Sequence, residues 1–258
     1  MLRWFEHKQV YVPSRVMETC TLDWPREDVR FHARDGCELN GWFFPAEKSA
    51  PRRELVLLLM HGNAGNICTR LPFYEAWLSL GLNVFSFDYR GYGASAGVPS
   101  EQGTYDDALG AHAWLEKKGF LPRNIIALGK SLGGGIASEL ASRTNVGGLI
   151  LQSTFTSIAD AGAHLFPFLP VRWMNRIRYA TVEKLPQIRV PVMIIHSRDD
   201  KVIPFQHAQR NYSAANDRKM FWEIRGGHTG VIETDRAHYL EGLKLFLNAN
   251  FTPSPITE

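Results

Sequence analysis

The chain has 258 residues, of which 45% are hydrophobic and 21% are charged. This length is sufficient for one sizeable core, and α/β domains of this size commonly form a single unit. The formal net charge is only +3 and the sequence holds no dense basic run, which argues against a nucleic-acid-binding protein. We therefore predict one domain over residues 1–258 that has no nucleic-acid partner.

Cysteine content and hydropathy bear on the cellular compartment. Three cysteines, Cys20, Cys37 and Cys68, are an odd and sparse set, which argues against a disulfide framework and favours a reducing compartment. Residues 1–8 interrupt their apolar side chains with charges, so no signal peptide is predicted. The longest apolar run, residues 55–60, is far shorter than the ~18–20 residues of a membrane span. These features predict a cytoplasmic protein.

The N-terminal residues 1–8 are basic and aromatic, so contact with a membrane surface is one interpretation. The stretch is short, however, and lacks a sustained amphipathic period. We favour the alternative, in which it forms a strand or a cap that packs on the domain.

Apolar runs predict the strands in chain order. The first two flank the turn Arg34-Asp35-Gly36 and predict an antiparallel hairpin. The predicted strands are 29–33, 38–44, 55–60, 82–87, 125–128, 147–152, 190–195 and 219–224. The predicted helices are 70–80, 101–118, 132–143, 204–213 and 232–248. Strands that alternate with helices predict an α/β fold: a mainly parallel, doubly wound sheet with helices on both faces and an N-terminal antiparallel hairpin.

Residues 154–186 hold no clear strand and have room for one or two short helices. We predict that they form a small helical lid within the single domain. Aromatic side chains in this lid segment support two interpretations equally, an acyl pocket and ordinary core packing. They are Phe155, Phe166, Phe168 and Trp173. Residues after Phe251 are polar and contain prolines, which predicts a loose tail.

The stretch from Ile125 to Gly135 carries the strongest functional signal. A short apolar run leads into Gly129-Lys130-Ser131-Leu132-Gly133 and then into a small-residue segment compatible with a helix. A strand, a sharp turn and a helix with serine at the apex would expose the hydroxyl and direct the helix N-terminus toward it. We predict that Ser131 is a nucleophile.

A serine hydroxyl needs an imidazole to accept its proton and a carboxylate to orient that imidazole. Both groups are expected on loops at the carboxyl edge of the sheet, where Ser131 emerges. Asp199, Asp200 and His228 follow the strands that end at residues 195 and 224, and the chain order Ser, Asp, His is the one that this architecture uses.

We predict His228 as the general base and Asp200 as the orienting acid. Asp199 is the alternative acid, and Asp200 is preferred because two residues separate it from Ile203-Pro204. The alternative for His228 is a structural loop histidine, which the two preceding glycines and its place after the last strand make the weaker interpretation.

A developing oxyanion needs preorganised donors. In this architecture one is the backbone N–H after the nucleophile, here Leu132, and the other comes from the loop after an earlier strand. We place the second donor at Asn63, in the loop 61–65. A phosphate-binding loop is excluded because Gly129-Lys130-Ser131 lacks a glycine five residues before Gly129, where Asn124 stands.

Nine histidines raise the question of a metal site. None forms a His-x-x-x-His pair with a carboxylate on a clear helix. We predict neither a metal nor a cofactor.

Several motifs together resemble the α/β-hydrolase superfamily and, more narrowly, the minimal-lid branch of its α/β-hydrolase-domain serine hydrolases. They are residues 61–66, 87–93, 129–134, 200–204 and 227–228. The resemblance extends from about Val10 to the closing helix and implies the α/β-hydrolase fold. It places the acid at the aspartate before x-Val-x-Pro, which supports Asp200, and it makes residues 89–93 a structural loop, so Arg90 is not expected to be catalytic.

Two features depart from this branch. Relatives often carry an N-terminal membrane anchor ahead of a segment like Gln9–Ser14, and this sequence has only a short stretch there. The second residue of the elbow is often arginine in the branch and is Lys130 here, which changes the local electrostatics without removing the mechanism.

The sequence therefore predicts a serine hydrolase that cleaves carboxylic esters with short to medium acyl groups through an acyl-enzyme. The expected partner is a small-molecule ester or thioester. A thioesterase, an acyltransferase or a serine peptidase with the same three residues is the alternative, and a non-catalytic ligand-binding member of the fold is a weaker one. A serine nucleophile disfavours dehalogenase and epoxide-hydrolase chemistry, which resembles cases that use aspartate at this position.

Overall fold

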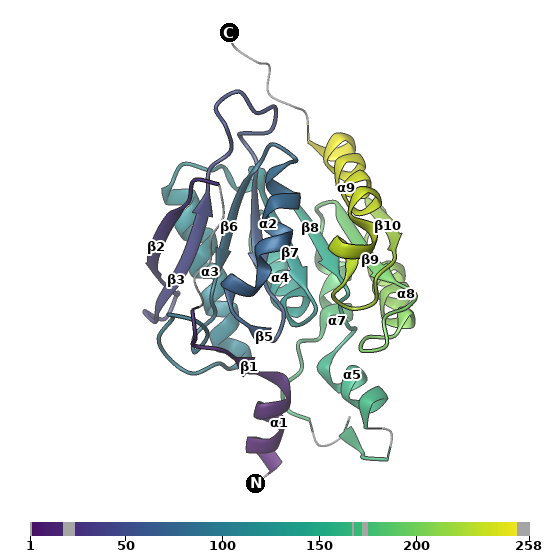
Figure 1. Ribbon diagram of the computed structural model, residues 1–258. Coiled ribbons are helices and arrows are strands. Elements are labelled where there is room, and N and C mark those ends of the chain that lie inside the picture. The colour runs from purple at the N-terminus through teal and green to yellow at the C-terminus, as the bar shows by residue number, and fades with distance from the viewer. Residues whose placement is uncertain (1, 18–23, 167, 172–174, 252–258) are drawn as a thin grey trace.

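The computed structural model describes residues 2–17, 24–166, 168–171 and 175–251. Its centre is an eight-stranded sheet in the order β10-β9-β8-β7-β4-β6-β3-β2 (Figure 1). The strands are β2 (Glu27–His32), β3 (Glu38–Phe44), β4 (Val56–Met60), β6 (Asn83–Phe87), β7 (Ile125–Lys130), β8 (Gly148–Gln152), β9 (Val192–Ser197) and β10 (Lys219–Ile224). From β6 to β10 every pairing is parallel.

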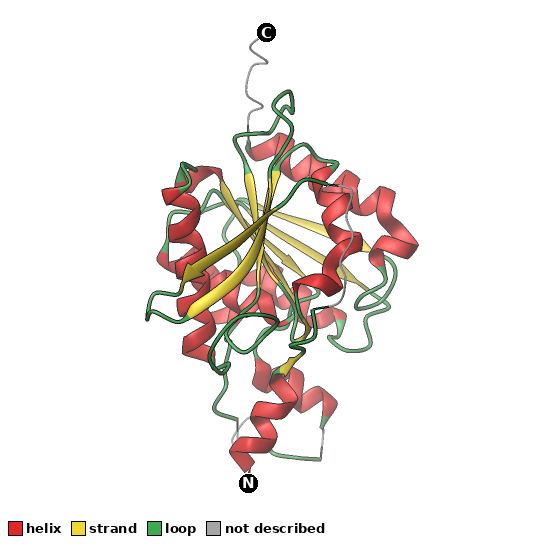
Figure 2. Cartoon of the chain, turned by 60° about the vertical axis from the view of Figure 1, so that its left-hand side comes forward, coloured by secondary structure: helices red, strands yellow, loops and turns green. Residues whose placement is uncertain are grey.

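Helices cover both faces of this sheet (Figures 1 and 2). The α-helices are α1 (Leu2–Val10), α2 (Leu71–Leu78), α3 (Glu101–Lys117), α4 (Leu132–Arg143), α5 (Ile158–Leu165), α7 (Thr181–Lys184), α8 (Phe205–Ala214) and α9 (Val231–Asn250). Short 3₁₀ helices span Ile67–Arg70, Pro122–Asn124 and Leu185–Gln187. The predicted α/β architecture, with its mainly parallel sheet, is confirmed.

Alternation along the central strands explains the two layers. In β4, Val56, Leu58 and Met60 belong to one apolar cluster, whereas Leu57 and Leu59 belong to the other. Side chains of a strand point alternately to the two faces, so a continuous apolar run serves two cores at once. The helices α2 and α9 complete one core, and α3 and α4 contribute to the other.

The N-terminal hairpin is also as predicted. The strand β2 pairs antiparallel with β3, and β3 pairs antiparallel with β6. Along the edge strand β2 only Val29 and Phe31 are buried, which is the alternating pattern of a strand with one face toward water.

The N-terminal segment is a helix, so of the two predicted forms, a strand and a cap, the strand is wrong. Residues 2–10 form the helix α1, which lies beside α5 at one end of the molecule (Figure 2). Glu6 Oε1 accepts hydrogen bonds from the backbone N–H groups of Arg176 and Ile177, at 2.7 and 2.8 Å. After the helix, β1 (Val12–Pro13) forms a short parallel pair with β5 (Ala64–Gly65).

The cysteines correct another expectation. Cys37 is free, whereas Cys68 is disulfide-bonded, although the odd and sparse set of cysteines was taken as an argument against disulfides. The compositional argument failed because an odd count leaves room for one bridge beside one thiol. The cysteine argument for a reducing compartment fails with it. Among the helices of the described residues, none is both long and apolar enough to cross a bilayer. The predicted tail after Phe251 lies outside the described residues.

Candidate active site

Ser131 stands at a sharp turn between β7 and α4. Its backbone adopts φ 53° and ψ −116°, a strained conformation for a residue with a side chain. Its N–H donates to the carbonyl of Gln152 at 2.9 Å, which ties the turn to the neighbouring strand β8. This turn is the predicted elbow, and it presents the serine hydroxyl at the carboxyl edge of the sheet.

The flanking glycines permit this turn because the backbone packs closely around it. A Cβ on Gly129 would lie 2.4 Å from the carbonyl oxygen of Gly133. A Cβ on Gly133 would lie 1.9 Å from the carbonyl oxygen of Met60, at the end of β4. The first turn of α4 therefore rests directly on the strand that leads into residues 61–65.

We expect Gly133→Ala to destabilise the fold by about 1–3 kcal/mol or more, because the new methyl group would overlap backbone that has no room to move. Gly62→Ala is the matched control, since a Cβ there would make only ordinary contacts of 3.7 Å. Urea unfolding of the two variants measures the difference. Equal stabilities would contradict the close packing described here.

The structure brings Ser131, His228 and Asp200 together. His228 Nε2 lies 3.1 Å from Ser131 Oγ, and His228 Nδ1 lies 2.7 Å from Asp200 Oδ2. Ser131 follows β7, Asp200 follows β9 and His228 follows β10, so the three side chains come from the carboxyl ends of three strands in the parallel part of the sheet, with β8 between the first two. The hydrogen bonds form a continuous chain from a buried carboxylate through an imidazole to a serine hydroxyl.

The surroundings of Asp200 favour its ionised form. Its burial opposes ionisation, but the hydrogen bond from His228, the charge of that ring and the backbone N–H of Ile203 outweigh burial and hold the pKa below its ordinary value. Oδ1 accepts the N–H groups of Val202 and Ile203 at 2.9 and 2.8 Å. Asp199 is exposed, with its side chain outside this chain of bonds, so the geometry favours Asp200 over its neighbour.

The predicted oxyanion donors lie beside the serine. Asn63, Leu132, Ser131 and His228 line one cavity. A Cβ on Gly62 would lie 3.7 Å from the Cβ of Ser131, so the loop passes directly against the elbow. The backbone N–H groups of Asn63 and Leu132 donate to no acceptor among the described residues.

The cavity has a volume of about 540 Å³ and a mostly apolar wall. Its apolar lining consists of Val10, Leu132, Phe155, Ile158, Ala161, Gly162, Leu165, Phe166, Leu169, Val171, Val202 and Ile203. Of the aromatic residues considered for an acyl pocket, Phe155 and Phe166 line it, Phe168 is 97% exposed, and Trp173 lies outside the described residues.

The contribution of α1 to the cavity wall was not predicted from the sequence. Glu6, Gln9 and Val10 all line the cavity. Residues 1–8 show no sustained amphipathic period, and the position of α1 beside α5 depends on tertiary contacts. No local signal in the sequence could have placed these residues near Ser131.

Two basic residues of the motifs, Arg90 and Lys130, have structural partners. Arg90 donates to Asp107 and to Asp35, which agrees with its expected structural place. Lys130 is buried with its Nζ 4.3 Å from the centre of the Phe73 ring. Burial, together with the charge of Arg70, lowers the pKa of Lys130 to about 8. Neither side chain lines the cavity.

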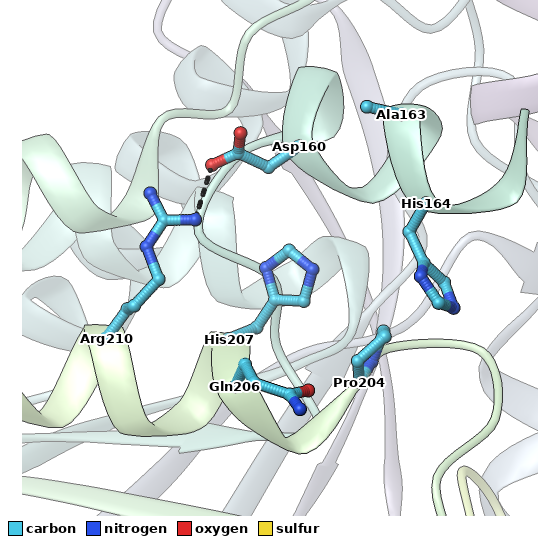
Figure 3. Close-up of a pocket in the computed structure, with 7 residues that line it drawn as sticks. All are labelled: Asp160, Ala163, His164, Pro204, Gln206, His207 and Arg210. Carbon is cyan, nitrogen blue, oxygen red and sulfur yellow. Dashed lines mark ion pairs between the residues drawn. The ribbon is translucent and has the colours of Figure 1, made fainter. Parts of the chain in front are cut away.

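Within the described part of the chain, no group of three or more histidine, cysteine, aspartate or glutamate side chains could hold a metal ion. A second cavity, of about 390 Å³, lies between α5 and α8 (Figure 3). Asp160 and Arg210, which line it, form an ion pair at 3.1 Å. The two cavities thus lie on different sides of α5.

The sheet order, the elbow on β7 and the residues that meet there define an α/β hydrolase. Residues 51–181 match the Hydrolase_4 family, described as serine aminopeptidase, S33. The chain belongs to this family of the α/β-hydrolase superfamily.

Its relatives include proteins from bacteria and animals. It is 34% identical to the uncharacterised protein Rv2307c of Mycobacterium tuberculosis, over 96% of this chain and 89% of that protein. It is 38% identical to the lysophosphatidylserine lipase ABHD12 of Danio rerio, over 67% of this chain and 50% of the lipase.

Solved structures share the fold. The Pyrococcus furiosus esterase Pf2001 superposes with a TM-score of 0.77 at 20% identity, covering 94% of this chain and 98% of the esterase. An α/β hydrolase from Vibrio vulnificus superposes with a TM-score of 0.79 at 20% identity, covering 95% of this chain and 94% of that hydrolase.

Proposed function

We propose that this hydrolase is a serine esterase that cleaves carboxylic esters through an acyl-enzyme. The observation that carries the proposal is the hydrogen-bonded chain from Asp200 through His228 to Ser131, which ends in the cavity of about 540 Å³. A serine with such partners at neutral pH is a nucleophile.

In the acylation step, Ser131 Oγ attacks the ester carbonyl while His228 Nε2 takes the hydroxyl proton. The resulting imidazolium is stabilised by Asp200, which remains ionised. The oxyanion accepts hydrogen bonds from the backbone N–H groups of Asn63 and Leu132. Collapse of the tetrahedral intermediate breaks the carbon–oxygen bond of the ester, and His228 gives its proton to the departing alkoxide.

In the deacylation step, water replaces the alcohol. His228 takes a proton from the water as its oxygen attacks the acyl carbonyl, and the second tetrahedral intermediate uses the same two donors. Its collapse returns the proton to Ser131 Oγ and releases the carboxylic acid. The enzyme is thereby restored without a cofactor.

An ester substrate is supported by the apolar wall of the cavity, which suits an acyl chain better than a peptide backbone rich in hydrogen-bonding groups. Two of the similar proteins, the lysophosphatidylserine lipase ABHD12 and the Pyrococcus esterase, are named as enzymes that act on esters. The family description as serine aminopeptidase favours a second candidate, a peptidase that uses the same three residues.

The experiment that tests the proposal compares p-nitrophenyl esters of increasing acyl length with thioesters and with aminoacyl p-nitroanilides. An esterase hydrolyses the esters with a maximum at short to medium chains and leaves the anilides nearly untouched. Preference for the anilides would overturn the ester assignment in favour of the peptidase. Faster transfer of the acyl group to an added alcohol than to water would instead identify an acyltransferase.

We expect Ala161→Phe to move the acyl-length maximum toward shorter chains, because Ala161 lines the cavity and is nearly fully buried. The rate for the longest good substrate should fall about tenfold or more, as each displaced methylene group loses its contacts. The matched control is Ala163→Phe, on the same helix α5, since Ala163 lines the second cavity instead (Figure 3).

The kcat/KM values for the ester series measure both variants. Identical shifts in the two variants would contradict the assignment of the larger cavity to the acyl group, because only one of the two side chains faces it.

A further inference from the structure

The peptide that joins Gly62 to Asn63 carries one of the two proposed oxyanion donors, the Asn63 N–H. The carbonyl of the same peptide, on Gly62, lies 2.7 Å from Nδ1 of His61. His61 is completely buried, and the mechanism described above does not use its side chain. The imidazole therefore contacts the donor peptide at its carbonyl oxygen.

The geometry defines which ring nitrogen of His61 carries a proton. A carbonyl oxygen can only accept, so Nδ1 is the donor in the bond to Gly62. Nε2 has no hydrogen-bond partner among the described residues and lies 3.7 Å from Asp88 Oδ1. Burial, assisted by the charge of Arg70, lowers the pKa of His61 to about 3, and burial raises the pKa of Asp88 to about 7. The ring is thus neutral with its proton on Nδ1.

Neighbouring carbonyls are held as well. The carbonyl of His61 accepts a hydrogen bond from the Tyr89 hydroxyl at 2.8 Å. The carbonyl of Asn63 accepts the Tyr92 hydroxyl at 2.9 Å and the backbone N–H of Val12 at 3.1 Å. Three successive carbonyls of this loop are therefore fixed, and the middle one belongs to the donor peptide.

We propose that His61 is a positioning residue for the oxyanion site, whose Nδ1–H holds the Gly62 carbonyl and so directs the Asn63 N–H toward the carbonyl oxygen of the substrate. A trans peptide is planar, with its C=O and N–H pointing in opposite directions, so fixing one group orients the other. The bond to the carbonyl also polarises the amide and strengthens its N–H as a donor. This inference rests on the proposed serine-esterase function.

The test compares two substitutions at His61 in the full-length protein. His61→Leu removes the donor and keeps a buried side chain of similar bulk beside the rings of Tyr89 and Tyr92. His61→Asn places an amide Nδ2–H close to where Nδ1–H lies in the imidazole, so it is the conservative variant. Tyr89→Phe is the matched control, because it removes a hydrogen bond to the neighbouring carbonyl and leaves the donor peptide's own bond intact.

The measured quantities are kcat and KM for a p-nitrophenyl ester, the Ki of an aryl trifluoromethyl ketone, and the melting temperature. We expect His61→Leu to lower kcat about 10- to 100-fold with little change in KM, since the donor matters mainly once the oxyanion forms. The Ki of the ketone, which forms an oxyanion on Ser131, should rise by a similar factor. His61→Asn should recover most of both losses, and Tyr89→Phe should change them little.

Several results would overturn the proposal. One is a folded His61→Leu protein with wild-type kcat, and another is an equal loss in the leucine and asparagine variants. A loss that follows the melting temperature across all three variants would indicate a purely structural role. Failure of the proposed function itself is separately visible, because the wild type would then hydrolyse no ester and would not bind the ketone.

Discussion

Replacement of Ser131 by alanine is expected to lower kcat for ester hydrolysis by about 10⁵- to 10⁶-fold, with the fold unchanged. The hydroxyl forms the covalent bond to the acyl group. Among the described residues, Ser131 is the only side chain that forms a hydrogen bond with His228 Nε2, so no other hydroxyl can replace it. Residual turnover would come from the oxyanion donors and from substrate binding alone. Initial rates, measured together with a far-ultraviolet spectrum, test this expectation.

Ser153 supplies the matched control for that substitution. It is also a buried serine with a positive φ, 50°, at the end of the neighbouring strand β8, but it does not line the cavity. We expect Ser153→Ala to retain activity within about threefold of the wild type. A Ser131→Ala protein that kept most of its rate would contradict the assignment of the nucleophile.

Replacement of Asp200 by asparagine is expected to lower kcat by about 10⁴-fold. The amide has no negative charge to stabilise the imidazolium of His228. It can also donate to Nδ1 and so leave the proton on Nε2, where it would block removal of the Ser131 proton. The loss should appear in kcat much more than in KM, because the carboxylate acts when His228 becomes charged.

Asp199→Asn is the control because the two aspartates are adjacent and only Asp200 is buried against His228. Its kcat is expected to stay near the wild-type value. If the two variants exchanged behaviours, with Asp199→Asn inactive and Asp200→Asn active, the acid would be Asp199 and the described geometry would be wrong for this loop.

The strands were predictable because the physics that forms them is local. Five of them, β4, β6, β7, β8 and β9, are largely apolar runs that are buried along their whole length, and such runs appear directly in the sequence. The positions of Ser131, Asp200 and His228 followed from the same runs, because in a parallel sheet the residues after successive strands meet at one edge.

Features that depend on tertiary contacts were not predictable. The helix α1 has no marked amphipathic pattern, and its contribution to the cavity arises from its position beside α5 and from the hydrogen bonds between Glu6 and residues 176 and 177. The contact between His61 and the Gly62 carbonyl depends on the path of a loop that its neighbours hold. The pairing of Cys68 likewise depends on which segments the fold brings together.

The most direct test of the central claim, that Ser131 is an activated nucleophile, is labelling with a fluorophosphonate followed by peptide mapping with mass spectrometry. Attack by Ser131 Oγ on phosphorus forms an oxygen–phosphorus bond and expels fluoride, so each chain should gain a single adduct on the peptide that contains Ser131. The Ser131→Ala variant should gain none. A folded wild-type protein that stays unlabelled, or that carries the adduct on another residue, would contradict the account.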